Sequence, residues 1–314
     1  MIKPPLNSRA ALLCQEIEVR ANELQVTKQE LANGTTLFDF GINTPGGQSA
    51  GVILARVCLA DLAEVSVVEP KPWPIVRVTS EAPVAACLAS QYAGWEVKGE
   101  KFFAMGSGPM RAAAGREALF DDIGYREQVT TCVGVLESGT LPPEAVCQEL
   151  AEKCGIEADQ LTLLVAPTSS LAGTLQVVAR SVETALHKLH ELGFDLSRVE
   201  RGEGTAPLAP VAKNDLAAIG VTNDAILYGG EVTLWVRGDD ESLSKIGPRV
   251  PSNDSRDYGR PFVEVLSECD NDFYRVDPLL FSAAKITFVN LDTDQTHSFG
   301  ETNLAVLERS FGSV

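Results

Sequence analysis

Short apolar runs of strand length alternate with longer stretches of helical periodicity along this chain, and this alternation constrains the fold more than any other sequence feature. Strands are expected at 35–42, 65–68, 75–78, 130–136, 161–165, 225–227, 232–236 and 285–289. Helices are expected at 49–62, 83–92, 143–154, 261–269 and 302–311, with another ending near 120. Alternating helices and strands predict an α/β protein with mixed sheets covered by helices.

The two longest helical patterns lie in the first two-thirds of the chain. Apolar residues recur at three- and four-residue steps from Leu6 to Leu31, and Asn33-Gly34 is expected to end that helix. A second long helix is expected to follow Ser170 and to run to about Leu192.

The texture of the sequence changes near Gly193, after which Gly and Pro separate short segments. We therefore expect two α/β lobes, 1–193 with the candidate catalytic helix and 194–314, and an exchange of segments between the lobes is compatible with this pattern.

Charge and cysteine content narrow the class of protein. The chain has 314 residues, 26 basic and 43 acidic, for a net charge of −17, which argues against binding of nucleic-acid backbones. We find no apolar run of the ~18 residues that a membrane span needs and expect no secretory leader. The seven cysteines form no CxxC pair, so reduced, cytoplasmic thiols are expected and no zinc site.

A glycine-containing turn at Gly106-Ser107-Gly108-Pro109-Met110-Arg111 is the first candidate for chemistry. Glycines let the backbone approach a ligand, and Ser107 and Arg111 could hold an anion near a helix start. A plain strand-to-helix turn is the alternative. The stretch has no GxGxxG pattern, so it is not a dinucleotide-binding fingerprint.

The second candidate is the helix that follows Ala166-Pro167-Thr168-Ser169-Ser170. One of the three hydroxyl residues is expected to cap it. Arg180, Glu183 and His187 follow at steps of three and four, which places them on one face of a helix that is apolar over a wide arc. An arginine beside a carboxylate lowers the pKa of that carboxylate and orients it, as a positioned base requires; a solvated salt-bridge stripe is the alternative.

Two further groups leave alternatives open. His187 and His190, with Glu191 beside them and His297 far along the chain, could form a metal site, although such histidines more often face water near a helix end. The polar stretch from Ser252 to Phe262 either lines a site or is mobile.

Together these segments resemble the methenyltetrahydromethanopterin cyclohydrolase family over nearly the whole chain. The resemblance rests on motifs spread along the sequence: Gly106-Ser107-Gly108-Pro109 with Arg111, Ala166 to Gly173 running on to Gln176, Arg180 and Glu183, Asn223-Asp224, Tyr228-Gly229-Gly230, Asp257 to Phe262, and Asp277-Pro278 with Phe281.

The resemblance implies an enzyme of C1 metabolism that converts the methenyl-tetrahydromethanopterin cation and water into the 5-formyl derivative. It implies a homotrimer without metal or other cofactor, a pocket between two α/β domains, and catalysis by Arg180 and Glu183. Substrate binding is expected at the residues that match the family's motifs: Ser107, Gly108, Arg111, Ser169, Tyr228, Gly229, Ser255, Asp257 and Tyr258.

A mechanism follows as a hypothesis. The methenyl carbon is strongly electrophilic, so it needs a positioned water and a base, and we expect Glu183 to be that base with Arg180 orienting it. A metal-dependent hydrolase using His187 and His190, or a pterin-binding protein without catalysis, are the alternative readings.

Overall fold

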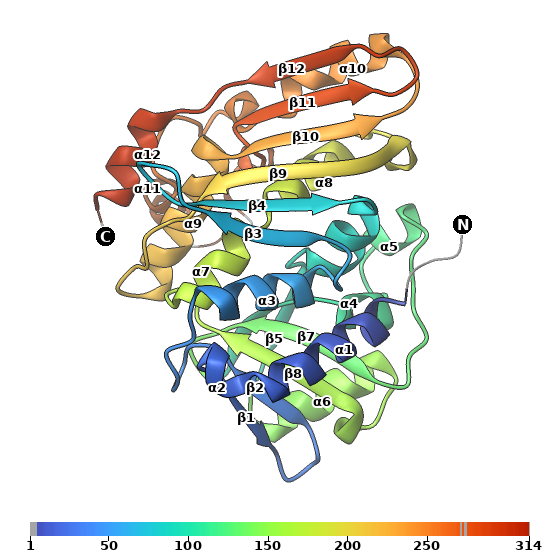
Figure 1. Ribbon diagram of the computed structural model, residues 1–314, viewed down its shortest axis with the longest axis vertical. Helices are drawn as coiled ribbons and strands as arrows, with labels where there is room; N and C mark the ends of the chain where they lie inside the picture. Colours follow the sequence, from blue (N-terminus) through green and yellow to red (C-terminus); the bar gives the residue numbers. More distant parts are fainter. Residues whose placement is uncertain (1–4, 271, 273–274, 314) are drawn as a thin grey trace. The chain divides into compact units, whose positions relative to one another are not determined.

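The computed structural model describes residues 5–270, 272 and 275–313, which form two compact units. Unit 1 contains the chain up to Ala63 together with Ala85–Gln176, and unit 2 contains Glu64–Val84 together with the chain from Val177 onward. Each unit is built on its own six-stranded mixed sheet with helices packed on it (Figure 1). The predicted α/β class with mixed sheets is confirmed.

The sheet of unit 1 has the strand order β1-β2-β8-β7-β6-β5. Its central strands β2, β8 and β7 are parallel, whereas β1, β6 and β5 pair antiparallel. The strands are β1 Thr27–Glu30, β2 Thr36–Asp39, β5 Trp95–Lys98, β6 Phe103–Ser107, β7 Cys132–Glu137 and β8 Leu161–Ala166.

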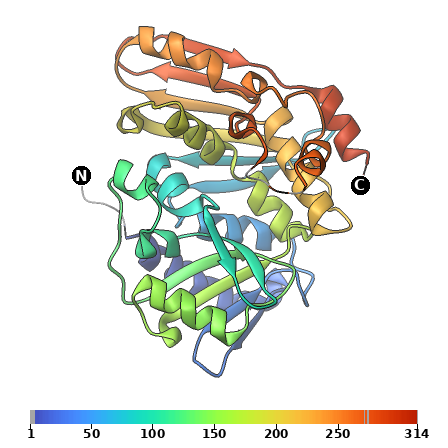
Figure 2. The ribbon, with the colours of Figure 1, turned by 180° about the vertical axis from the view of Figure 1, so that it is seen from behind.

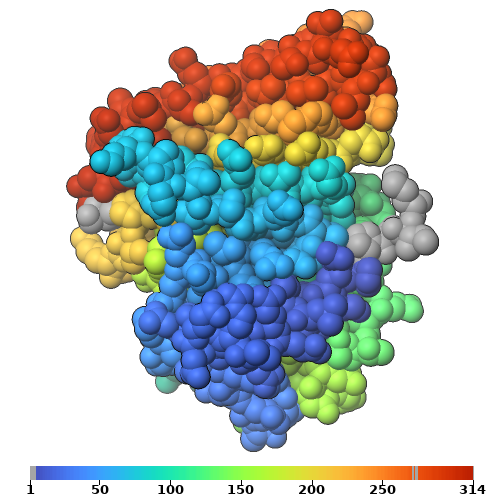
Figure 3. Space-filling model, viewed as in Figure 1, coloured from blue at the N-terminus to red at the C-terminus, as the bar shows by residue number. Residues whose placement is uncertain are grey.

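Apolar side chains from both faces of this sheet are buried, as expected for parallel strands covered on both sides. In β7, Val133 and Val135 pack with α1 and α3, whereas Cys132 and Leu136 pack with α6. Helix α1 lies at the surface in the space-filling view (Figure 3), and α6 covers the opposite face (Figure 2). The helices are α1 Leu6–Val19, α2 Ala21–Leu24, α3 Gln48–Cys58, α4 Met110–Ala114, α5 Leu119–Asp122 and α6 Glu144–Cys154, with the short 3-10 turn η2 Ala158–Gln160.

The sheet of unit 2 has the order β12-β11-β10-β9-β4-β3, in which only β10 and β11 are parallel neighbours. Alternate residues of β10 and β11 are buried, which fits a sheet with one well-covered face. The strands are β3 Glu64–Val68, β4 Ile75–Ser80, β9 Val199–Pro207, β10 Glu231–Val236, β11 Lys285–Asn290 and β12 Thr296–Gly300.

Helix α8 packs on β9 and β10, and α9 packs on β9 and carries α11 and α12 (Figure 2). The helices are α8 Ser181–Glu191, α9 Asp215–Gly229, α10 Asp240–Ile246, α11 Phe262–Glu268 and α12 Leu304–Phe311, with short 3-10 turns η3 Leu196–Arg198, η4 Gly247–Arg249, η5 Ser252–Asp254 and η7 Pro278–Leu280. Two further helices contain residues assigned to both units, because the chain passes from one unit to the other within them. They are the π-helix η1 Val84–Gln91 and the α-helix α7 Leu171–Val178.

The units do not follow the expected division at residue 193. The hairpin β3–β4 belongs to unit 2 because β4 pairs along its whole length with β9, from Ile75 opposite Pro207 to Ser80 opposite Gly202. Helix α8 belongs to unit 2 as well, because it packs on β9 and β10.

The prediction of one helix from Leu6 to Leu31 is wrong in its second half. Helix α1 ends at Val19, and Gln25 takes a left-handed conformation with φ of 55° before β1 begins. Strand β1 then pairs with β2 across Asn33-Gly34, with Gly34 at φ of 86°. Asn-Gly is a strong signal for a hairpin turn, and here it closes a hairpin rather than a helix.

Three other predicted elements differ from the structure. The apolar run Ala225–Leu227 is the last part of α9, whose start is capped by Asn214 accepting a hydrogen bond from the amide of Ala217 at 2.9 Å. The helix expected to end near 120 is two short helices, because Gly115 is left-handed. The long helix expected to reach Leu192 is interrupted at Ala179 and Arg180, between α7 and α8.

Candidate functional site

Arg180 and Glu183 lie at the junction between α7 and α8. Arg180 is the N-cap of α8, with φ of −92° and ψ of 10°, and its amide donates to the carbonyl of Val177 at 3.0 Å. Glu183 lies in the first turn of α8. Their exposed fractions are only 5% and 4%. The helix interruption therefore places a buried cation at the helix start and a buried anion three residues later.

The start of a helix is a favourable position for a carboxylate. The N-terminal end of a helix carries partial positive charge, which stabilises an anion in the first turn. Burying two ionisable groups costs free energy unless they interact with each other or with a ligand. A salt-bridge stripe facing water, the alternative for this helix, does not describe these two buried residues.

The start of α8 lies unusually close to the sheet of unit 2, and Gly204 of β9 makes this possible. A methyl group added at Gly204 would lie 2.4 Å from Oγ of Ser181 and 2.8 Å from a methyl carbon of Val182. Any larger residue at 204 would push the first turn of α8, and with it Glu183, away from the strand.

Four of the expected substrate-binding residues come together elsewhere in unit 2. Oγ of Ser255 donates to the Asp277 carboxylate at 2.7 Å and accepts from the amide of Asp257 at 3.1 Å. The rings of Tyr228 and Tyr258 lie 5.1 Å apart between centroids. The polar stretch that begins at Ser252 is thus an ordered turn around Ser255.

Tyr228 of α9 holds this turn through its hydroxyl group. The hydroxyl donates to the carbonyl of Arg260 at 2.6 Å and accepts from the amides of Gly259 and Arg260 at 3.1 and 3.2 Å. Burial raises the pKa of Tyr228 to about 12, so the phenol stays protonated and keeps its donor. Its neighbour Gly229 allows close packing, because an added methyl would lie 2.7 Å from Pro207.

Asp224, one turn before Tyr228 on α9, is a fully buried carboxyl group. It accepts a hydrogen bond from the amide of Phe262 at 2.8 Å and one from Oγ of Ser310 at 2.5 Å. Burial is the main cause that raises the pKa of Asp224 to about 7. It joins the start of α11 and the last turn of α12 to α9, so its role is to hold the elements around the turn.

In unit 1, Ser107 and Gly108 end strand β6. Ser107 is fully buried, and its Oγ lies 3.8 Å from Sγ of Cys58. Gly108 has φ of 86°, and its amide donates to the carbonyl of Ser90 at 2.9 Å. Gly108 thus joins the end of β6 to the π-helix η1, whereas Ser107 contacts the end of α3.

Of the three candidate caps before α7, Ser170 makes the capping bond. Its Oγ accepts from the amide of Gly173 at 3.0 Å and donates to the carbonyl of Pro167 at 2.8 Å. Ser169 lies next to it and is half-buried. Capping thus falls to Ser170 and leaves the Ser169 side chain outside the first helical turn.

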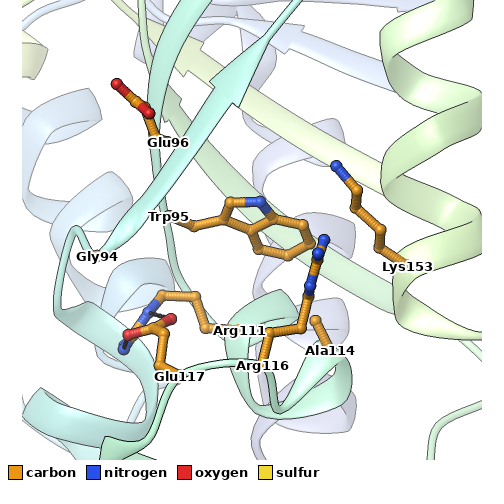
Figure 4. A pocket seen from close by; sticks show the side chains of 8 residues that line it. All are labelled: Gly94, Trp95, Glu96, Arg111, Ala114, Arg116, Glu117 and Lys153. Carbon is orange, nitrogen blue, oxygen red and sulfur yellow. Dashed lines mark hydrogen bonds and ion pairs between the residues drawn. The ribbon is translucent and has the colours of Figure 1, made fainter.

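The side chain of Arg111 is bonded to protein groups of unit 1. Nε and Nη2 of its fully buried side chain donate to the Glu117 carboxylate, and Nη1 donates to the carbonyls of Leu88 and Ser90 at 2.8 and 3.4 Å. Every guanidinium nitrogen thus already has a protein partner. Figure 4 shows Arg111 and Glu117 together in the wall of a pocket of about 240 Å³ in unit 1. The lining residues are Gly94, Trp95, Glu96, Arg111, Ala114, Arg116, Glu117 and Lys153.

Two of the three histidines lie together on α8. Nε2 of His187 and Nδ1 of His190 lie 3.9 and 3.7 Å from the same carboxylate oxygen of Glu191. His297 lies on β12 and contacts Asp240 at 2.9 Å. Among the described residues, no group of three or more His, Cys, Asp or Glu side chains is arranged to hold a metal ion. Within the same part of the chain, no helix combines the length and apolarity of a membrane span.

Sequence reasoning missed two residues of these networks. Lys188 of α8 has an exposed fraction of 1% and donates to the carbonyl of Leu279. Glu117 is the carboxylate that forms an ion pair with the guanidinium group of Arg111. Lysine is rarely buried, so nothing in the helical pattern around Lys188 distinguishes it from a surface residue.

These features define a two-domain α/β protein with a buried arginine and glutamate at the start of a helix. The family model described as cyclohydrolase (MCH) matches residues 5–311, and the chain belongs to this family. The resemblance seen in the sequence is thereby confirmed.

Relatives in both bacteria and archaea support the family. A methenyltetrahydromethanopterin cyclohydrolase of Methylobacillus flagellatus is 42% identical, over 98% of this chain and 96% of the relative. One of Rhodopirellula baltica is 46% identical, over 89% of this chain and 86% of the relative. One of Methanococcoides burtonii is 38% identical, over 98% of both chains.

Proposed function

We propose that the protein hydrolyses the methenyl-tetrahydromethanopterin cation to 5-formyl-tetrahydromethanopterin. The observation that carries the proposal is the burial of Arg180 and Glu183 at the start of α8, in a chain that matches the cyclohydrolase family over residues 5–311. The name that the relatives share supports the substrate, and the burial of Glu183 close to an arginine in the sequence supports the chemistry.

The reaction needs one water and one base. As water adds to the methenyl carbon, a C–O bond forms and the water loses a proton to the Glu183 carboxylate. The protonated Glu183 then returns this proton to the ring nitrogen whose C–N bond breaks. The hydroxyl group of the intermediate loses its proton as the C=O bond forms, the formyl group stays on N5, and one proton is released overall. Before the attack, the carboxylate also offsets the positive charge of the substrate. Arg180 orients the carboxylate and favours its charged form.

Substrate binding is proposed at the turn around Ser255, with Asp257, Tyr258, Tyr228 and Gly229. Ser107, Gly108 and Ser169 are proposed for the segments of unit 1. Arg111 is proposed to act on binding indirectly, because its guanidinium already holds Glu117 and the carbonyls at the end of η1. No cofactor takes part in this mechanism.

The test follows the loss of the methenyl chromophore with desalted protein in the presence of EDTA. Glu183→Gln is expected to lower kcat by about 10³-fold and to change KM little, because it removes a general base and keeps the shape. Glu191→Gln is the matched control, since Glu191 lies on the same helix with a side chain 47% exposed. Its kcat is expected to equal that of the wild type.

Each other outcome points elsewhere. Activity that EDTA abolishes would favour a metal-dependent hydrolase. Binding of the methenyl compound without hydrolysis would favour a binding protein. Near-normal turnover by Glu183→Gln would remove Glu183 from the mechanism.

The homotrimer is part of the same proposal. Light scattering on the purified protein should give about three times the 33.6 kDa of one chain. A mass of one or two chains would refute the trimer without touching the chemistry.

A further inference from the structure

Lys188 is a buried lysine on the helix that carries Glu183. Its exposed fraction is 1%, and its ammonium group donates to the carbonyl of Leu279 in η7. Burial, with a smaller contribution from Arg249, lowers the pKa of Lys188 to about 8 against the opposing effect of the carboxylates of Asp254 and Asp277. A buried cation is kept only where it is bonded and compensated, so this contact has a structural purpose.

The turn η7 that receives Lys188 is bonded directly to the turn around Ser255. Asp277 caps η7 by accepting from the amide of Leu279 at 3.1 Å, and its other oxygen accepts from Oγ of Ser255 at 2.7 Å. In return, the carboxylate of Asp257 accepts from the amide of Asp277 at 3.3 Å. Movement of η7 would therefore be transmitted to Ser255 and Asp257.

The other end of the connection is α8 itself. Glu183 and Lys188 are five residues apart, which corresponds to about 7.5 Å along the helix axis. Because α8 packs on β9 and β10, it is a fixed support for both side chains. One rigid element thus holds the proposed base at its start and, through Lys188, the turn around Ser255.

We propose that Lys188 is a positioning residue, whose buried ammonium group fastens η7, and through Asp277 the substrate-binding turn at Ser255–Tyr258, to the helix that carries Glu183. The inference rests on the proposed function for the ligand of that turn. It adds a residue that touches neither the water nor the base and that acts on the affinity for the pterin substrate.

The test replaces Lys188 with Met, which keeps an unbranched side chain and removes the ammonium group. Lys188→Met is expected to raise KM about tenfold, because one hydrogen bond from a charged donor is lost. It is expected to leave kcat within about twofold of the wild-type value. Hydrogen exchange at the amides of 255–260 is expected to become faster, while exchange in β9 stays as in the wild type.

The matched control is Lys153→Met in unit 1. Its ammonium group bonds Glu149 and lies 6.0 Å from the centroid of the Trp95 ring, so it has no part in the link from α8 through η7 to the turn around Ser255. It should change neither KM nor the exchange of 255–260. A rise in KM in both variants would point to a general effect of removing positive charge and would overturn the inference.

A second variant covers the case in which Lys188→Met does not fold. Asp277→Asn breaks the link at a half-buried position and should raise KM by a similar factor. In the double variant Lys188→Met/Asp277→Asn, the two effects on KM should be less than additive, because both act through one link. Additive effects, or an unchanged KM in Asp277→Asn, would overturn the inference.

The two proposals fail in different ways. No hydrolysis of the methenyl compound by the wild type refutes the proposed function, and the exchange rates of 255–260 then still decide whether Lys188 fastens the turn. If the wild type hydrolyses the methenyl compound, and Lys188→Met changes neither KM nor the hydrogen exchange of 255–260, then the role of Lys188 is refuted and the proposed function stands.

Discussion

Asp224 shows how a single buried carboxyl group makes the stability of the whole unit depend on pH. Its pKa is raised from 3.8 to about 7, chiefly by burial, so folding favours the protonated form. The stability that this proton contributes is complete below about pH 4 and is lost as the pH rises through about 7.

We therefore expect Asp224→Asn to change the pH dependence of unfolding. The amide can accept from Phe262 and donate to Ser310 without ionising. Between pH 5 and pH 8, the free energy of unfolding of the wild type should fall by about 2–3 kcal/mol relative to that of the variant, measured by urea denaturation. The exposed Glu241→Gln is the control, and parallel curves for wild type and Asp224→Asn would contradict the assignment.

Tyr228 gives a second prediction about a single residue. Tyr228→Phe removes one hydroxyl that serves two amides and one carbonyl of the turn. We expect KM for the methenyl compound to rise about tenfold at nearly constant kcat, since groups left without partners cost about 1–3 kcal/mol. Steady-state kinetics provides the check, and a large fall in kcat with constant KM would show that Tyr228 acts on the chemistry instead.

At this scale the sequence predicts residue types better than residue roles. Arg180 and Glu183 could be singled out from their spacing in an apolar helix, although their burial depends on an interruption that no Gly or Pro marks. Arg111 looks free in the sequence, because its partners are a glutamate six residues away and carbonyls from a distant helix. Lys188 resembles any surface lysine. Its burial is decided by Leu279, nearly a hundred residues further along the chain.

At the scale of elements, β9 fixes the position of the first turn of α8 through the small size of Gly204. Gly204→Ala is expected to lower the free energy of unfolding by about 1–3 kcal/mol, because the methyl would overlap Ser181 and Val182. It should also lower kcat, since Glu183 is displaced. Denaturation and kinetics on the same preparation measure both, and a normal kcat in the variant would show that the first turn tolerates the shift. Glu191→Gln again serves as the control, since its side chain is 47% exposed.

Elements with a strong local pattern could be predicted from the sequence, whereas their ends often could not. Strands such as β7 and β8 are nearly continuous apolar runs and were found within a few residues. Strand β1 was expected to be helical because Leu24 and Leu31 keep a helical spacing across Gln25, where the chain turns, whereas β2 lies within the predicted strand 35–42. The end of α9 was mistaken for a strand because a short apolar run looks alike in a buried helix and a buried strand.

At the scale of the whole molecule, neither unit is one continuous piece of chain. The α/β class followed from the alternation of patterns, but the pairing of β4 with β9 leaves no local mark in the sequence. The sequence becomes richer in Gly and Pro near Gly193, where we expected the boundary between two lobes. This position lies between α8 and β9, inside unit 2 and not at its boundary.

This division predicts the behaviour of fragments. Residues 194–314 expressed alone should lack a cooperative unfolding transition, because β9 loses β4 as its neighbour and the sheet loses α8. A chain that joins 64–84 to 177–314 through a flexible linker should regain the transition, measured by near-UV circular dichroism during heating. A cooperative transition in 194–314 alone would show that β3, β4 and α8 are dispensable.

During synthesis on the ribosome, the β3–β4 hairpin is made long before β9, the strand with which β4 pairs. Strand β4 is complete at Ser80, but its neighbour β9 begins only at Val199. At typical rates of synthesis, the edge of β4 stays without its partner for on the order of ten seconds. An unpaired strand edge can pair with a strand of another chain. During this interval, nascent copies of this protein on ribosomes of the same messenger RNA can therefore pair with each other through the edge of β4.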